Sequence, residues 1–90
     1  MTRKEITEKA KSSPNDLVGL LYTSGGYINY IKSYDKTEGF IIDYMYLRDR
    51  SIEYEPVNCT IYSFIEVEIN QEDFKYIRIS EINDWGMMRL

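Results

Sequence analysis

The sequence contains no histidine and only one cysteine among its 90 residues. Without histidine, neither a Ser-His-Asp nor a Cys-His catalytic arrangement can form, and histidine-ligated zinc is excluded. One cysteine cannot close an intramolecular disulfide or build a thiolate zinc or iron–sulfur site. A glycine-rich phosphate loop is also missing. We therefore expect a protein that is not an enzyme and that uses no metal and no cofactor.

Long apolar runs are absent too. No segment reaches the roughly 20 apolar residues that a membrane-spanning helix needs, and the N-terminal residues are polar and charged. The composition is poor in alanine and rich in Ile, Tyr, Lys and Asn, which is typical of AT-rich codons. These features predict a cytoplasmic protein of a bacterial cell, or one that a phage encodes in a bacterial host.

Alanine occurs once, whereas the chain has twelve isoleucines and nine tyrosines. Such β-branched and aromatic residues suit a pleated, half-buried sheet surface. Ninety residues correspond to one domain. We therefore predict a single mainly β (α+β) domain over residues 1–90, with a helix at 3–11, an antiparallel sheet over 16–82 and a tail at 83–90.

The helix prediction depends on a capping box, because Thr2 is followed by Glu5 at the required spacing. Residues 16–23 leave two alternatives open. Pro14 is suitable for the first position of a second helix, whereas Gly19 and the β-formers around it favour a strand.

Turn residues divide the rest of the chain into about five consecutive strands. Ser24-Gly25-Gly26 predicts a hairpin, Gly39 a loop with positive φ, and Pro56 a sheet edge or a bulge. The expected strands are Tyr27–Tyr34, Phe40–Arg48, Ile52–Glu55, Thr60–Ile69 and Phe74–Ile82, and Leu17–Thr23 precedes them in the strand alternative. A short helix followed by such strands predicts a meander or a small barrel. This order of elements resembles that of SH3-like and Sm-like barrels and implies no function.

The segment Thr60–Ile69 alternates most clearly between apolar and polar positions. As a strand, it would direct its isoleucines and Val67 toward the core. The opposite face would then carry two aromatic and two acidic side chains: Tyr62, Phe64, Glu66 and Glu68. Exposed aromatic residues bordered by charge are typical of a protein-binding surface.

Acidic residues are concentrated in the second half of the chain. Residues 1–50 have a net charge of +1, and residues 51–90 have a net charge of −5. Six acidic side chains and no basic one lie between positions 53 and 73, namely Glu53, Glu55, Glu66, Glu68, Glu72 and Asp73. A face of one sign attracts a partner of the opposite sign and disfavours direct binding of nucleic acid. These residues, with Tyr62 and Phe64, are the predicted contacts with a basic protein surface, of the kind that a small phage or mobile-element inhibitor engages.

An alternative site centres on Asp43, which interrupts an apolar strand. A carboxylate among tyrosines could hold an amine or the edge of a stacked base. The residues of this alternative ligand pocket are Asp43, Tyr44, Tyr46, Tyr30 and Tyr76. Such a pocket would make the protein a small-ligand or nucleotide-binding barrel, with homo-oligomers formed through exposed aromatic residues as a further alternative.

Overall fold

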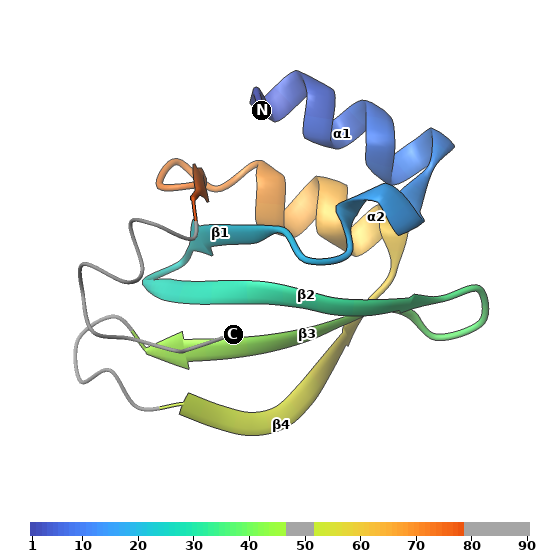
Figure 1. Ribbon diagram of the computed structural model, residues 1–90. Coiled ribbons are helices and arrows are strands. Elements are labelled where there is room, and N and C mark those ends of the chain that lie inside the picture. The colour runs from blue at the N-terminus through green and yellow to red at the C-terminus, as the bar shows by residue number, and fades with distance from the viewer. Residues whose placement is uncertain (47–51, 79–90) are drawn as a thin grey trace.

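The computed structural model of the chain describes residues 1–46 and 52–78, and the side chains of residues 1–44 and 57–78. In chain order the elements are α1 (Arg3–Ser12), η1 (Pro14–Leu17), β1 (Leu21–Ser24), β2 (Tyr27–Asp35), β3 (Gly39–Tyr46), β4 (Ile52–Cys59), α2 (Ile61–Ser63), η2 (Phe64–Ile69) and β5 (Lys75–Ile77). The strands form one antiparallel sheet, and the helices lie on one side of it (Figure 1).

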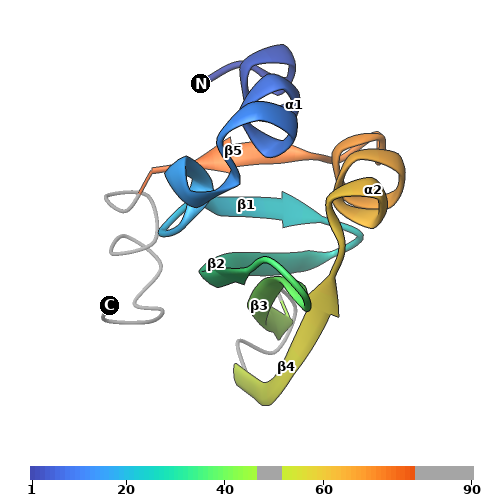
Figure 2. The same ribbon diagram turned by 90° about the vertical axis from the view of Figure 1, so that its right-hand side faces the viewer.

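The predicted mainly β fold with a short N-terminal helix is confirmed. The sheet order is β4-β3-β2-β1-β5, so the first four strands form a meander and β5 pairs with β1. Figure 2 shows these strands as one curved layer with α2 beside it. Because β4 and β5 are edges, the sheet is open. Among the described residues no helix is long and apolar enough to cross a bilayer.

The capping box predicted for α1 is present. Thr2 Oγ1 accepts a hydrogen bond from the Glu5 backbone N–H at 3.1 Å, and the Thr2 backbone N–H donates to Glu5 Oε1 at 3.3 Å. Ile6 and Ala10 lie on the inner side of the helix and are fully buried. The local sequence signal therefore sets where this helix begins.

Residues 16–23 combine parts of both alternatives. Pro14 begins a single 3-10 turn, and the strand begins only at Leu21. The hairpin after it is confirmed, since Ser24 pairs with Tyr27 across Gly25 and Gly26, which both have positive φ. Two such glycines suit the tight turn that joins twisted strands.

Pro56 lies in β4, an edge strand, where the pairing with β3 shifts register between Ile42 and Tyr44. The predicted edge or bulge is therefore confirmed, and β4 continues past it to Cys59. The predicted turn at 48–51, the end of the Phe74–Ile82 strand and the tail at 83–90 lie outside the described residues.

The prediction of a strand over Thr60–Ile69 is wrong, because this segment is a helix. Thr60 caps it by accepting a hydrogen bond from the Ser63 backbone N–H, and α2 continues into the π-helical η2. Hydrogen bonds from i to i+5 place Phe64 and Ile69 on the same buried side. The chain must also pass from one edge of the sheet to the other between β4 and β5, and this α2–η2 helix covers the sheet along the way.

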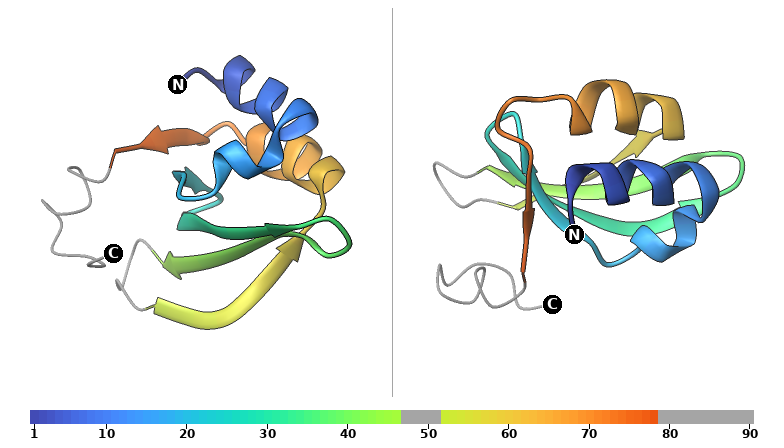
Figure 3. Two further views of the ribbon diagram at one scale, coloured as in Figure 1. Left: turned by 45° about the vertical axis from the view of Figure 1, so that its right-hand side comes forward. Right: turned by 90° about the horizontal axis from the view of Figure 1, so that it is seen from above.

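Helices α1 and α2–η2 lie side by side over the sheet (Figure 3). Their inner sides meet the sheet in one apolar cluster that contains the rings of Tyr22, Phe40 and Phe64. The Phe64 ring lies 5.5 Å from that of Tyr22 and 5.0 Å from that of Phe40, measured between centroids. Because α1 buries only Ile6 and Ala10, the α2–η2 helix supplies much of the apolar surface that covers this face of the sheet.

Candidate functional site

The helix separates the four residues that a strand would have aligned. Tyr62 is 73% exposed on the outside, whereas Phe64 is fully buried in the core. Glu66 is exposed, and Glu68 is partly buried between the helix and the sheet. The predicted contact through Phe64 is therefore wrong, while Tyr62, Glu66 and Glu68 remain accessible to a partner or ligand.

Glu72 and Asp73 lie in the turn that follows the helix. Both are exposed, but the Asp73 carboxylate accepts hydrogen bonds from the backbone N–H groups of Gly25 at 3.0 Å and Gly26 at 3.2 Å. The first of these bonds holds the pKa of Asp73 below its ordinary value. Asp73 therefore fastens this turn to the β1–β2 hairpin, and Glu72 is the freer of the two acidic groups.

For three further predicted residues the structure describes only the backbone. Glu53 and Glu55 belong to the β4 backbone, and Tyr46 ends β3 opposite Tyr27. The Cα of Glu53 pairs with that of Tyr44. The side chains of Glu53, Glu55 and Tyr46 are not among those described.

The residues of the alternative pocket do not come together. Asp43 and Tyr30 are cross-strand partners, and alternation along β3 puts Asp43 on the opposite face from Tyr44. Asp43 forms an ion pair with Lys32 at 4.0 Å instead of being buried alone. Tyr76 pairs with Tyr22 on the helix-covered face. Of the described side chains in this set, Tyr44 and Tyr76 line two different pockets.

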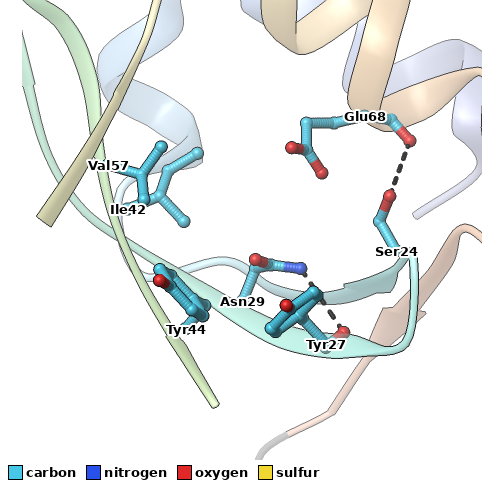
Figure 4. A pocket seen from close by; sticks show the side chains of 7 residues that line it. All are labelled: Ser24, Tyr27, Asn29, Ile42, Tyr44, Val57 and Glu68. Atoms are coloured by element: carbon cyan, nitrogen blue, oxygen red, sulfur yellow. Dashed lines mark hydrogen bonds between the residues drawn. The ribbon is translucent and has the colours of Figure 1, made fainter. Parts of the chain in front are cut away.

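An open pocket of about 260 Å³ lies between the α2–η2 helix and the sheet (Figure 4). Tyr27, Asn29 and Tyr44 form one side, with the two tyrosine rings edge to face at 5.1 Å between centroids. Ile42 and Val57 form an apolar wall. Glu68 reaches toward these residues from η2, so the pocket combines aromatic, apolar and acidic groups.

The position of Glu68 is fixed by the sheet. The Ser24 hydroxyl donates a hydrogen bond to the Glu68 backbone oxygen at 3.2 Å and so satisfies a carbonyl at the end of the helix. The Thr23 hydroxyl likewise donates to the Asp73 backbone oxygen at 3.2 Å. These contacts, together with the Asp73 turn, hold the helix end over the pocket before any ligand binds.

Within the described part of the chain, no positive charge is among the groups that shift the pKa of Glu68. Burial raises the pKa of its carboxyl, and the Asp73 carboxylate adds to this, while the hydroxyls of Ser24 and Tyr22 act in the opposite direction. The buried Tyr22 hydroxyl makes no hydrogen bond of regular geometry, and burial and then Glu68 raise its pKa. Burial and Glu68 also raise the pKa of Cys59 to about 12, so this thiol is inert. Among the described residues, Glu68 is a partly buried carboxylate without a cation.

Glu68 is expected to weaken the fold as the pH rises. The pKa of Glu68 is higher in the folded than in the unfolded chain, so the fold favours the protonated carboxyl. Its contribution to the free energy of unfolding is therefore fully present below pH 4.5 and is lost as the pH rises through the raised pKa. Glu68→Gln should remove this loss, so the variant should gain stability relative to the wild type between pH 4 and pH 7. Urea unfolding of both proteins at several pH values in this range measures the difference.

Glu66→Gln is the matched control, since it removes an exposed carboxylate from the same helix. A stability difference between Glu68→Gln and the wild type that does not change from pH 4 to pH 7 would contradict the account of Glu68.

Sequence reasoning missed Asn29 and Ser24 as parts of the site. Asn29 interrupts an apolar strand just as Asp43 does, and this signal was present in the sequence. Asn29 is 7% exposed, and its amide lies on the pocket side of β2. Its relation to Glu68 depends on the path of the helix, which the strand prediction concealed.

Comparison with known proteins identified no relative of this chain. No protein-family model, no curated protein and no solved structure matches the chain. The described residues also contain no group of three or more Cys, Asp or Glu side chains that could hold a metal ion. The class that the fold and the site define is an α+β protein with an open antiparallel sheet, two helices on one face and an acidic pocket between helix and sheet.

Proposed function

We propose that this protein is a non-enzymatic binding module that engages a basic surface of a larger protein through its α2–η2 helix. It would act as a small cytoplasmic regulator or inhibitor of the kind that phages and mobile elements carry. The contact surface consists of the exposed residues of the helix and the following turn, which we call the acidic surface: Tyr62, Glu66, Val67 and Glu72.

One observation carries this proposal: in the described part of the chain no ion pair neutralises Glu66 or Glu72, and the nearby Arg3 donates to the backbone oxygens of Gln71 and Phe74 instead. Among the described residues, the ion pair is between Lys32 and Asp43, and none involves Glu66 or Glu72. No basic residue occurs from position 57 to position 74. Tyr62 and Val67, which are 73% and 54% exposed, supply apolar area beside these charges. Aromatic anchors with unpaired charges nearby favour a partner of opposite sign.

A nucleotide-binding barrel has less support. The sheet is open, and Tyr30 and Asp43 face away from the tyrosines of the pocket. The pocket, at about 260 Å³, is also smaller than the roughly 300–1,000 Å³ typical of small-molecule sites. Its volume suits a single side chain better than a nucleotide.

Charge reversal at the acidic surface tests the proposal. The double variant Glu66→Lys/Glu72→Lys should reduce recovery of the partner from a lysate of the source organism or its host by roughly tenfold, because attraction becomes repulsion. Quantitative mass spectrometry of proteins retained by the immobilised chain measures the recovery. Raised salt should weaken the wild-type interaction as well.

The matched control is Glu8→Lys/Asp16→Lys, which changes the net charge equally at exposed positions of α1 and η1. This control should retain the partner. Equal recovery by both double variants would contradict a contact through the acidic surface. Recovery of only a second copy of the chain would show self-association instead.

A further inference from the structure

The pocket between η2 and the sheet contains two hydrogen-bond acceptors that could bind a positively charged group. One is the Glu68 carboxylate, which has no cation beside it among the described residues. The other is Asn29 Oδ1, because the Asn29 amide donates from Nδ2 to the Tyr27 backbone oxygen at 3.4 Å and makes no other hydrogen bond within the described part of the chain. Asn29 is only 7% exposed, and its amide is directed into the pocket (Figure 4). A carboxylate gains most from a hydrogen-bond donor that also carries a positive charge.

The remaining walls suit a group that is flat and positively charged. The perpendicular rings of Tyr27 and Tyr44 both line the pocket, and aromatic rings attract a cation. Ile42 and Val57 offer apolar contact for an alkyl stem, and Val57 is 45% exposed at the rim. A guanidinium group combines positive charge, a planar shape and several donors in a fixed geometry.

We propose that this pocket binds a guanidinium group, with Glu68 and Asn29 as its acceptors and the two tyrosines beside its plane. The source of the group, which rests on the proposed function, is an arginine side chain of the basic partner. The pocket would then anchor one side chain, while the acidic surface on the outside of the helix faces the charges around it. The helix end need not move, because Ser24 and Asp73 already fix it to the β1–β2 hairpin.

The direct test uses a small probe instead of the partner. N-acetyl-arginine methylamide is titrated into the ¹⁵N-labelled protein, and amide shifts are followed by NMR. The shifts should centre on the Asn29 side-chain amide and on the backbone of Ser24, Tyr27 and Tyr44. N-acetyl-citrulline methylamide, which has nearly the same shape and no charge, should bind at least roughly tenfold more weakly, since a charged hydrogen-bonding partner is lost.

Two variants complete the test. Glu68→Gln, which retains the backbone contact with Ser24, should weaken binding of the arginine probe by roughly tenfold or more. Glu66→Gln, on the same helix but exposed, should change it less than twofold. Equal binding of the arginine and citrulline probes, or undiminished binding by Glu68→Gln, would overturn the proposal.

The experiments distinguish an error in the guanidinium assignment from an error in the proposed function. If the arginine probe causes no localised shifts but Glu66→Lys/Glu72→Lys still loses the partner, the pocket assignment is wrong and the acidic surface is retained. If the probe binds as expected and Glu68→Gln also loses the partner, both are supported. If the probe binds but no partner depends on Glu68, the assignment of the partner's arginine is overturned.

Discussion

Phe64→Ala is expected to lower the free energy of unfolding by about 3–5 kcal/mol. Phe64 is fully buried and contacts the rings of Tyr22 and Phe40, so truncation leaves a cavity where the α2–η2 helix meets the sheet. This is a large part of the roughly 5–15 kcal/mol that stabilises a typical domain. Urea unfolding followed by circular dichroism measures the loss.

Tyr62→Ala is the matched control for Phe64→Ala, since it removes an aromatic ring two residues earlier. Tyr62 is 73% exposed, so the change should alter stability by no more than about 0.5 kcal/mol. A strand would place both rings on one face and make their truncations similar. Nearly equal losses for the two variants would therefore contradict the helix.

Gly39→Ala should destabilise the protein by about 2–4 kcal/mol, through backbone strain together with overpacking. Gly39 has φ +89°, and an added Cβ would lie 2.7 Å from the Cys59 backbone oxygen and 2.9 Å from the Thr60 Cα. Both contacts are with backbone at the junction of β4 and α2, which cannot turn aside as a side chain could. Thermal and urea unfolding measure the effect.

Gly25→Ala provides the comparison for Gly39→Ala. Gly25 has φ +63° with no atom within 4 Å of an added Cβ, and its N–H bond to Asp73 can persist. We expect a loss of about 1 kcal/mol, from the left-handed conformation alone. If Gly25→Ala cost as much as Gly39→Ala, the close approach of β3 to the β4–α2 junction would be refuted.

Local signals in the sequence predicted the first half of the fold well. The capping box at Thr2 and Glu5, the pair Gly25-Gly26 and the positive φ of Gly39 each depend on a few neighbouring residues. Such signals work because the backbone conformation they require is set within one turn.

The segment Thr60–Ile69 shows where local reasoning failed. Its alternating residues fit a strand, yet Ile61, Phe64, Ile65 and Ile69 also have the spacing of a helix, and all four are buried or partly buried. Tertiary requirements decide between the two patterns. The chain must cross from β4 to the far edge of the sheet, and the face that α1 covers only partly needs a second apolar surface.

The wrong strand prediction for Thr60–Ile69 also made part of the predicted binding site wrong. Four candidates taken from one strand register separate into a core residue, two exposed residues and a pocket residue. The pocket itself brings together β1, β2, β3, β4 and η2, so no short motif could predict it. The sequence did indicate that this region is acidic and aromatic. Glu68 is the predicted acidic residue that lines the pocket.

The most direct measurement of the central claim is the affinity of the purified partner for the wild type and for Glu66→Lys/Glu72→Lys, at low and at physiological salt. We predict that charge reversal weakens binding by roughly tenfold or more at low salt, and that raised salt narrows the difference in affinity between the two proteins. Equal affinity of the two proteins at both salt concentrations would contradict binding through the acidic surface.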